Sequence, residues 1–175
     1  PLIPIASLSR SFSPSNDSVR STETEASMHE QHMRRAIELA SRNPEAPFGA
    51  VLVDSQSGQV VSEGVNRWKE NPSWHGEIDA INRCAAENPG VAWSRLHLYT
   101  TAEPCCMCQG AILWAGVPEV VFGTSIRTLK RLGWRQIDIC AEEVTRRTPF
   151  ARCKLIGGVL ERDCDALFEA AARRS

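Results

Sequence analysis

Two short segments of the chain carry residue types that bind metal ions and move protons. His75-Gly76-Glu77 opens one expected helix, and Pro104 with Cys105 opens another that also contains Cys108. Cys105 and Cys108 are three positions apart, so a helix places both sulfurs on one face of one turn, where they can hold one ion. The positive end of that helix favours the thiolate form of both side chains.

His75 supplies the third ligand that this pair of cysteines needs. A Cys₂His set leaves the fourth tetrahedral position of a zinc ion open for water, which is typical of a catalytic rather than a structural site. Glu77 lies two positions from His75, and we expect it to lie beside the zinc without binding it. A carboxylate there can take a proton from the water and pass it to a leaving group. Two other interpretations of the cysteines stay open, a redox pair and a structural zinc site.

Alternating helical and strand patterns must position these residues. Apolar spacing and turn residues predict an α/β fold, a three-layer αβα arrangement with a central five-stranded mixed sheet and helices on both faces. The binding site of such a sheet lies where strands end and helices begin. The expected helices are 27–42, 75–87, 105–114, a short one at 124–132 and a closing one at 160–171; the expected strands are 48–54, 59–63, 96–100, 119–123 and 152–155.

Length and composition limit the remaining possibilities. A chain of 175 residues and 19.3 kDa suits one domain, which we place at 27–175 after a flexible N-terminal extension, 1–26. No apolar run approaches the roughly 18 residues of a membrane helix. Twenty basic residues against 21 acidic ones give a net charge of −1, so composition does not favour a nucleic-acid partner, although RNA stays possible. We expect a cytoplasmic protein, with export after removal of a signal peptide left open.

The combination His-x-Glu…Pro-Cys-x-x-Cys is the signature of zinc deaminases. The sequence therefore resembles the cytidine deaminase-like superfamily, and over about residues 28–170 it is most similar to the purine branch, especially bacterial guanine deaminases. The resemblance implies a zinc-dependent hydrolytic deaminase that removes an exocyclic amine from a purine-type nucleobase or nucleoside and releases ammonia. It also implies a homodimer with sites near the subunit interface. The matching stretches are 47–53, 63–66, 75–81, 103–115 and 146–150.

The resemblance also implies substrate contacts by position. Asn66 would hydrogen-bond the purine, Phe48 would stack on its face, Trp114 would help to wall the pocket, and the backbone amide of Gly76 would face the substrate carbonyl. A flat heterocycle suits an aromatic wall and an amide that both donates and accepts. Ordinary alternatives stay open: Asn66 as a loop-capping amide, and Phe48 and Trp114 as core packing.

The chain departs from the guanine deaminase pattern at several positions. The family usually has Ala where this chain has Gly76. Guanine deaminases typically carry an acidic residue where Arg135 stands, and an arginine cannot accept from guanine N–H groups; Asp138 is a candidate substitute. The aromatic C-terminal tail is missing, since the chain ends at 170–175 in Ala, Arg and Ser. The alternatives are a tRNA adenosine deaminase, which shares the zinc site, and a noncatalytic zinc-stabilised scaffold.

Overall fold

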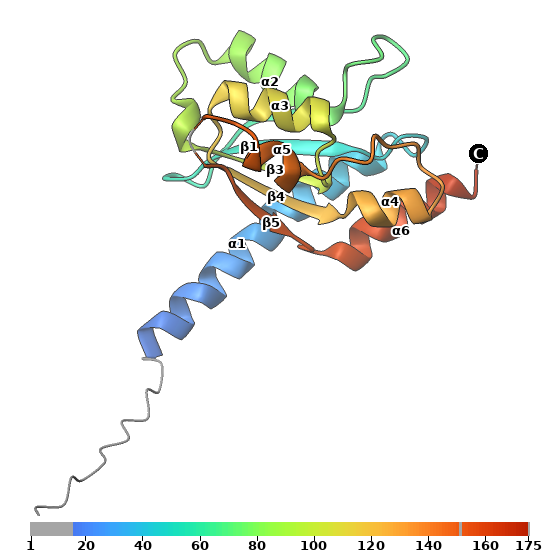
Figure 1. The fold of residues 1–175 in the computed structure, drawn as a ribbon. Coiled ribbons are helices and arrows are strands. Elements are labelled where there is room, and N and C mark those ends of the chain that lie inside the picture. Colours follow the sequence, from blue (N-terminus) through green and yellow to red (C-terminus); the bar gives the residue numbers. More distant parts are fainter. Residues whose placement is uncertain (1–15, 151, 175) are drawn as a thin grey trace, which may run out of the picture.

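The computed structural model describes residues 16–150 and 152–174, and a five-stranded mixed sheet lies between two layers of helices (Figure 1). The strand order is β2-β1-β3-β4-β5. β1 pairs antiparallel with β2 and with β3, whereas β3, β4 and β5 run parallel. The predicted α/β fold with five strands is confirmed. The strands are β1 Gly49–Asp54, β2 Val60–Val65, β3 Leu96–Ala102, β4 Glu119–Thr124 and β5 Lys154–Gly157.

Alternation along the central strands produces two separate cores. Even-numbered residues such as Leu52 and Leu98 are buried in the core beneath α2 (Gly76–Glu87) and α3 (Cys106–Ala115). Their odd-numbered neighbours, such as Val51 and Tyr99, pack on the opposite side against α1 (Asn16–Ser41) and α6 (Glu161–Ala172). Because successive strand side chains point to opposite faces, a sheet buried on both sides reads as a nearly continuous apolar run.

The first helix begins earlier than the sequence predicts. α1 starts at Asn16, so the predicted start at Ser27 is wrong, and the expected capping box there lies inside the helix. Neither proline nor glycine occurs between Pro14 and Ser27, so nothing in the sequence interrupts a helix over this stretch. Of the predicted extension, residues 1–15 lie outside the described part, and the domain limits remain predictions.

A short helix that the sequence analysis missed follows α4 (Ile126–Arg131). α5 spans Ala141–Arg146 and packs beside α3, with a hydrogen bond of 3.1 Å from Gln109 Nε2 to Thr145 Oγ1. Two glutamates in its first turn and an arginine in its last complement the helix dipole. That charge pattern was the available signal, because six residues are too few for a hydrophobic period.

Candidate metal centre

The ends of strands and the starts of helices bring the expected metal ligands together. His75 is the N-cap residue of α2, and Cys105 is the N-cap residue of α3. β3 ends at Ala102, so a loop of a few residues carries the chain from the sheet edge to Cys105. The site therefore lies at the edge of the sheet where parallel strands finish, as the fold class predicts.

The three candidate ligand atoms converge on one point. His75 Nδ1 lies 3.6 Å from Cys105 Sγ and 3.5 Å from Cys108 Sγ. Among the described residues, these three form the one group of histidine, cysteine or carboxylate side chains whose ligand atoms all lie within 4.8 Å of one another. One nitrogen and two sulfurs suit zinc, and they leave a tetrahedral position free of protein ligands. The geometry fits the predicted ion.

The electrostatics of the cysteine pair favour a thiolate. The hydrogen bond from the Cys108 thiol lowers the pKa of Cys105 to about 4, with His75 acting in the same direction and burial opposing. The pKa of Cys108 is raised because its thiol is held in that hydrogen bond and is buried. These opposite shifts favour the thiolate form of Cys105, which is the form that binds a cation.

Glu77 lies buried beside these ligands, with 3% of its surface exposed. Burial raises the pKa of its carboxyl group, and the charge of Cys105 adds to this effect. Thr100 Oγ1 donates to Glu77 Oε1 over 3.3 Å and orients the carboxylate. Sequence reasoning missed Thr100; the signal was its even position on β3, on the same face as Leu98, which faces α2.

Phe48, Gly76 and Asn66 form a second unit next to the start of α2. The Phe48 carbonyl oxygen accepts from Asn66 N over 3.0 Å, and a Cβ added at Gly76 would lie 2.8 Å from that oxygen. Asn66 Oδ1 accepts from Trp68 N over 3.0 Å, so this side chain does cap its loop. The Phe48 ring packs edge-on against Trp134, with ring centroids 5.4 Å apart. Sequence reasoning did not assign Trp134 to this wall.

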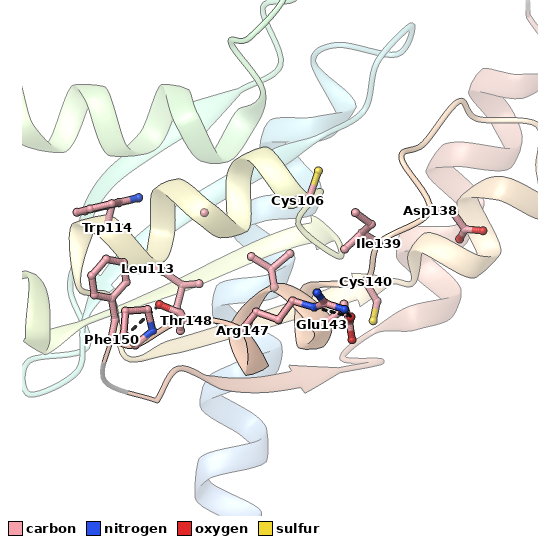
Figure 2. Close-up of a pocket in the computed structure, with 13 residues that line it drawn as sticks. Cys106, Leu113, Trp114, Asp138, Ile139, Cys140, Glu143, Arg147, Thr148 and Phe150 are labelled. Atoms are coloured by element: carbon pink, nitrogen blue, oxygen red, sulfur yellow. Dashed lines mark hydrogen bonds and ion pairs between the residues drawn. The ribbon is translucent and has the colours of Figure 1, made fainter.

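Trp114 does not join these residues. Its side chain is 79% exposed on the far end of α3, and its ring packs against Phe150 with centroids 4.6 Å apart. Figure 2 shows the two rings side by side at one end of a groove formed by α3, α5 and the chain after α5. Trp114 therefore lines a mainly apolar groove, which Cys106 and Ile139 also border, rather than a surface shared with Phe48.

The residues expected to read the base lie in the exposed segment after α4. Arg135 is exposed, and Asp138 is exposed and forms an ion pair with Lys130. Figure 2 shows Asp138 set apart from the rings of Trp114 and Phe150. Since Lys130 already neutralises Asp138, this carboxylate is a weak substitute for the acidic residue of guanine deaminases.

Comparison with known proteins agrees with this chemistry. A family model described as the cytidine and deoxycytidylate deaminase zinc-binding region matches residues 26–124. The guanine deaminase of Bacillus subtilis is 33% identical over 139 residues, which cover 73% of this chain and 86% of that protein. The tRNA-specific adenosine deaminase of Haemophilus influenzae is 40% identical over 101 residues, but the match spans only 58% of its length and 55% of this chain.

Solved structures share the fold. A protein crystallised in complex with 8-azaguanine has a TM-score of 0.72 and 26% identity, over 84% of this chain and 86% of that chain. The guanine deaminase of Nitrosomonas europaea has a TM-score of 0.69 and 24% identity, over 82% of this chain and 84% of that one. The second likeness bears on the fold alone.

Proposed function

Since the chain belongs to the cytidine and deoxycytidylate deaminase family and carries its zinc-binding region, we propose that it removes an exocyclic amine from a purine-type nucleobase or nucleoside. The reaction consumes one water molecule, breaks the bond between the ring carbon and the amine, and releases ammonia. Guanine is the first candidate substrate, because the Bacillus relative that aligns with most of this chain is a guanine deaminase.

The observation that carries the proposal is the position of Glu77. It is a buried carboxylate on the first turn of α2, and its neighbour at the helix start, His75, belongs to the three-residue ligand cluster. A structural zinc site needs no such group beside it, whereas general acid–base catalysis does. The hydrogen bond from Thr100 keeps the carboxylate oriented.

The residues of the chain divide the work of the reaction. His75, Cys105 and Cys108 would hold the zinc ion, which when bound acidifies a water molecule and so supplies the nucleophile at neutral pH. Glu77 takes the proton of the attacking water and later donates it to the amine nitrogen. The nitrogen leaves as ammonia, and the ring carbon keeps the oxygen.

Three residues at or next to the start of α2 support recognition of a flat base. The Oδ1 atom of Asn66 is engaged by its own loop, so its amide nitrogen would donate to the substrate. The Phe48 ring is held from the side by Trp134, an arrangement that suits stacking. Gly76 lets the Phe48 backbone approach the helix closely, and its N–H would face the substrate carbonyl.

The tRNA adenosine deaminase activity is the second candidate, supported by the relative that is 40% identical over 101 residues. Its substrate is an RNA, which requires free cationic side chains around the site. Arg146 and Arg147 both form ion pairs with Glu143, and Lys130 pairs with Asp138. These pairings reduce the positive charge available for phosphates and favour the small substrate.

We propose a homodimer in which a second copy covers the groove lined by Trp114 and Phe150. Both rings are exposed, as is Ile139 toward the other end of the groove, and apolar groups of this size are favoured at subunit contacts (Figure 2). A Trp114→Glu variant should then sediment as a monomer, and an unchanged sedimentation coefficient would exclude this surface.

Among the described residues no helix is long and apolar enough to cross a membrane. A cytoplasmic location remains a prediction.

The deciding experiment measures ammonia release from a panel of guanine, guanosine, adenine, adenosine, cytosine, cytidine and triazine analogues, with and without a chelator. Turnover of a purine that the chelator abolishes supports the proposal. A tRNA anticodon hairpin in the same panel tests the second candidate, and its editing without turnover of any base or nucleoside would replace the first.

A noncatalytic scaffold is the alternative from another class. The matched pair Glu77→Gln and Glu87→Gln separates it from an enzyme, because both glutamates lie on α2 but only Glu77 is buried at the ligand cluster. Full biological activity of a zinc-loaded Glu77→Gln protein would support the scaffold.

A further inference from the structure

Glu103 is a carboxylate that the proposed reaction does not use. It lies between the end of β3 and the metal loop, and its backbone N–H donates to Thr124 O over 2.7 Å, which ties the loop to the end of β4. Its side chain makes two further bonds. Oε2 accepts from Ile126 N and Oε1 accepts from Ala141 N, each over 2.9 Å.

Both of these backbone amides belong to the first residue of a helix. Ile126 begins α4, and Ala141 begins α5. The first amides of a helix have no partner within the helix, and a carboxylate is a strong acceptor for them. One side chain therefore joins two helix starts that are separated in sequence by α4 and by the segment that carries the half-buried Trp134 and the exposed Arg135.

Each of the two connections leads back to the candidate site. From α4 the chain reaches Trp134. Its backbone N–H donates to Leu129 O over 3.0 Å, and its ring packs edge-on against Phe48. From α5, Thr145 Oγ1 accepts from Gln109 Nε2, and Gln109 is the fully buried neighbour of Cys108. Glu103 is thus connected on one side to the aromatic wall and on the other to the metal-binding helix.

We propose that Glu103 is a positioning residue whose carboxylate holds the segment between α4 and α5 against the metal loop, and so sets where the aromatic wall of Phe48 and Trp134 stands relative to the metal centre. The inference rests on the proposed function, because it assigns Glu103 to the same reaction. It acts through the wall and touches neither the substrate nor the metal.

The two-oxygen geometry makes the role specific to glutamate. Glutamine keeps one acceptor oxygen, but its other terminal group is an NH₂, which cannot accept a hydrogen bond from a backbone N–H. It can therefore satisfy only one helix start. Aspartate keeps the charge but is one methylene shorter, so it cannot span both amides as they are placed. Glu142, exposed in the first turn of α5, offers a matched control that loses the same charge without losing either bond.

The test compares the zinc-loaded full chain with its Glu103→Gln and Glu142→Gln variants. Hydrogen exchange measured by mass spectrometry should be about tenfold faster at the starts of α4 and α5 in Glu103→Gln, which corresponds to one charge-assisted hydrogen bond lost. In kinetics with the substrate found in the panel, KM should rise severalfold while kcat changes less and zinc content stays stoichiometric. Glu142→Gln should match the wild type. If Glu103→Gln does not fold, Glu103→Asp takes its place with the same readouts.

Three results would overturn the proposal. Unchanged exchange at both helix starts would mean that the carboxylate does not hold them. Faster exchange with an unaltered KM would mean that the bonds serve stability alone. Loss of zinc would place the role in the metal loop instead of the wall. A wild-type chain that releases ammonia from no substrate refutes the proposed function. The exchange comparison needs no turnover, so it still shows in that case whether Glu103 holds the two helix starts.

Discussion

The two ends of strand β3 each gather histidine and carboxylate side chains, and they differ in whether the protein itself neutralises them. At the start of β3, His97 pairs in register with Glu119 of β4, and His97 Nδ1 lies 3.2 Å from Glu119 Oε1. Lys154 Nζ lies 3.0 Å from the other carboxylate oxygen. On α1, His29 Nδ1 lies 3.1 Å from the Tyr99 hydroxyl oxygen. This cluster contains its own cation.

At the other end of β3, the ligand cluster has no lysine or arginine in the hydrogen bonds described for it. The negative groups there are the Cys105 thiolate, which belongs to the cluster, and Glu77 beside it, and the three ligand atoms lie within 4.8 Å of one another. At the start of β3, His29 Nε2 is buried without a hydrogen-bond partner and lies 4.0 Å from Glu119 Oε1, yet neither residue belongs to such a convergent group. The comparison teaches that a metal centre is marked by ligand atoms that converge on one point with no lysine or arginine to neutralise them. A cluster of titratable side chains that contains its own cation does not mark one.

The largest expected effect is on kcat, and it should differ between carboxylates at the two ends of β3. Glu77→Gln should lower kcat by about 10²–10⁴-fold with zinc retained, because the acid–base group is lost. Glu119→Gln removes a buried carboxylate from the other end and should leave kcat of the folded protein within about threefold, since distant sites act independently. Steady-state ammonia release measures both variants. Equal losses in the two variants would break the comparison.

Metal content sharpens the comparison next. Cys108→Ser should weaken zinc binding by at least about 100-fold, more than the loss of an outer-shell partner causes, because a direct ligand is removed. His97→Asn, at the other end of β3, should keep zinc stoichiometric. Elemental analysis after dialysis against a weak chelator reports both. Stoichiometric zinc in Cys108→Ser, or its loss in His97→Asn, would reverse the assignment of the two ends.

The metal cluster was predictable from the sequence because its signals are local. Two cysteines one helical turn apart, a proline before them and a histidine with a glutamate two positions on all lie at helix starts, and residue type and spacing define the geometry. The strands were predictable for the same reason, since short apolar runs between turn residues leave few other structures.

Residues whose roles depend on distant partners could not be predicted. Nothing in the sequence near Glu103 indicates bonds to Ile126 and Ala141, and Thr100 reads as one more strand residue. The start of α1 was missed because a good local cap at Ser27 outweighed the lack of any helix breaker before it. Trp114 is expected to wall the pocket from its position in the sequence, and the structure places it in the groove that Phe150 also lines, so its contact with a substrate stays a prediction.

His97 on β3 and His32 on α1, whose ring lies 5.0 Å from that of Tyr99 between centroids, predict a moderate pH effect on stability. Burial lowers the pKa of His32, and nearby His29 and His97 add to this effect. Burial also lowers the pKa of His97, with Glu119 opposing and Lys154 assisting. Because the folded pKa lies below the unfolded value of about 6.5, the unfolded chain binds more protons once the pH falls below that value. The free energy of unfolding should therefore decrease as the pH falls from about 6.5 through the lower folded pKa.

Urea unfolding at pH 7.5 and 5.5 measures this effect against a variant that carries His32→Gln and His97→Asn. The wild type should lose on the order of 1 kcal/mol more than the double variant over this interval. Groups at the metal centre titrate equally in both proteins, so their contribution cancels in the difference. An equal loss of unfolding free energy in both proteins would show that these histidines have the same pKa in the folded and the unfolded chain.

The smallest expected effect tests how closely the metal end is packed against its substrate wall. Gly76→Ala places a methyl group 2.8 Å from the Phe48 carbonyl oxygen, so the backbone of Phe48 must move, and with it the hydrogen bond to Asn66. A shift of this size should raise KM for a purine about threefold, because one contact is misplaced and none is removed. Gly110→Ala on α3 is the control, since a Cβ there meets nothing within 4 Å. Relatives that carry alanine at this position should place the ring farther from the helix, so an unchanged KM in Gly76→Ala would mean that the loop before β1 adapts freely and that the close approach does not shape the pocket.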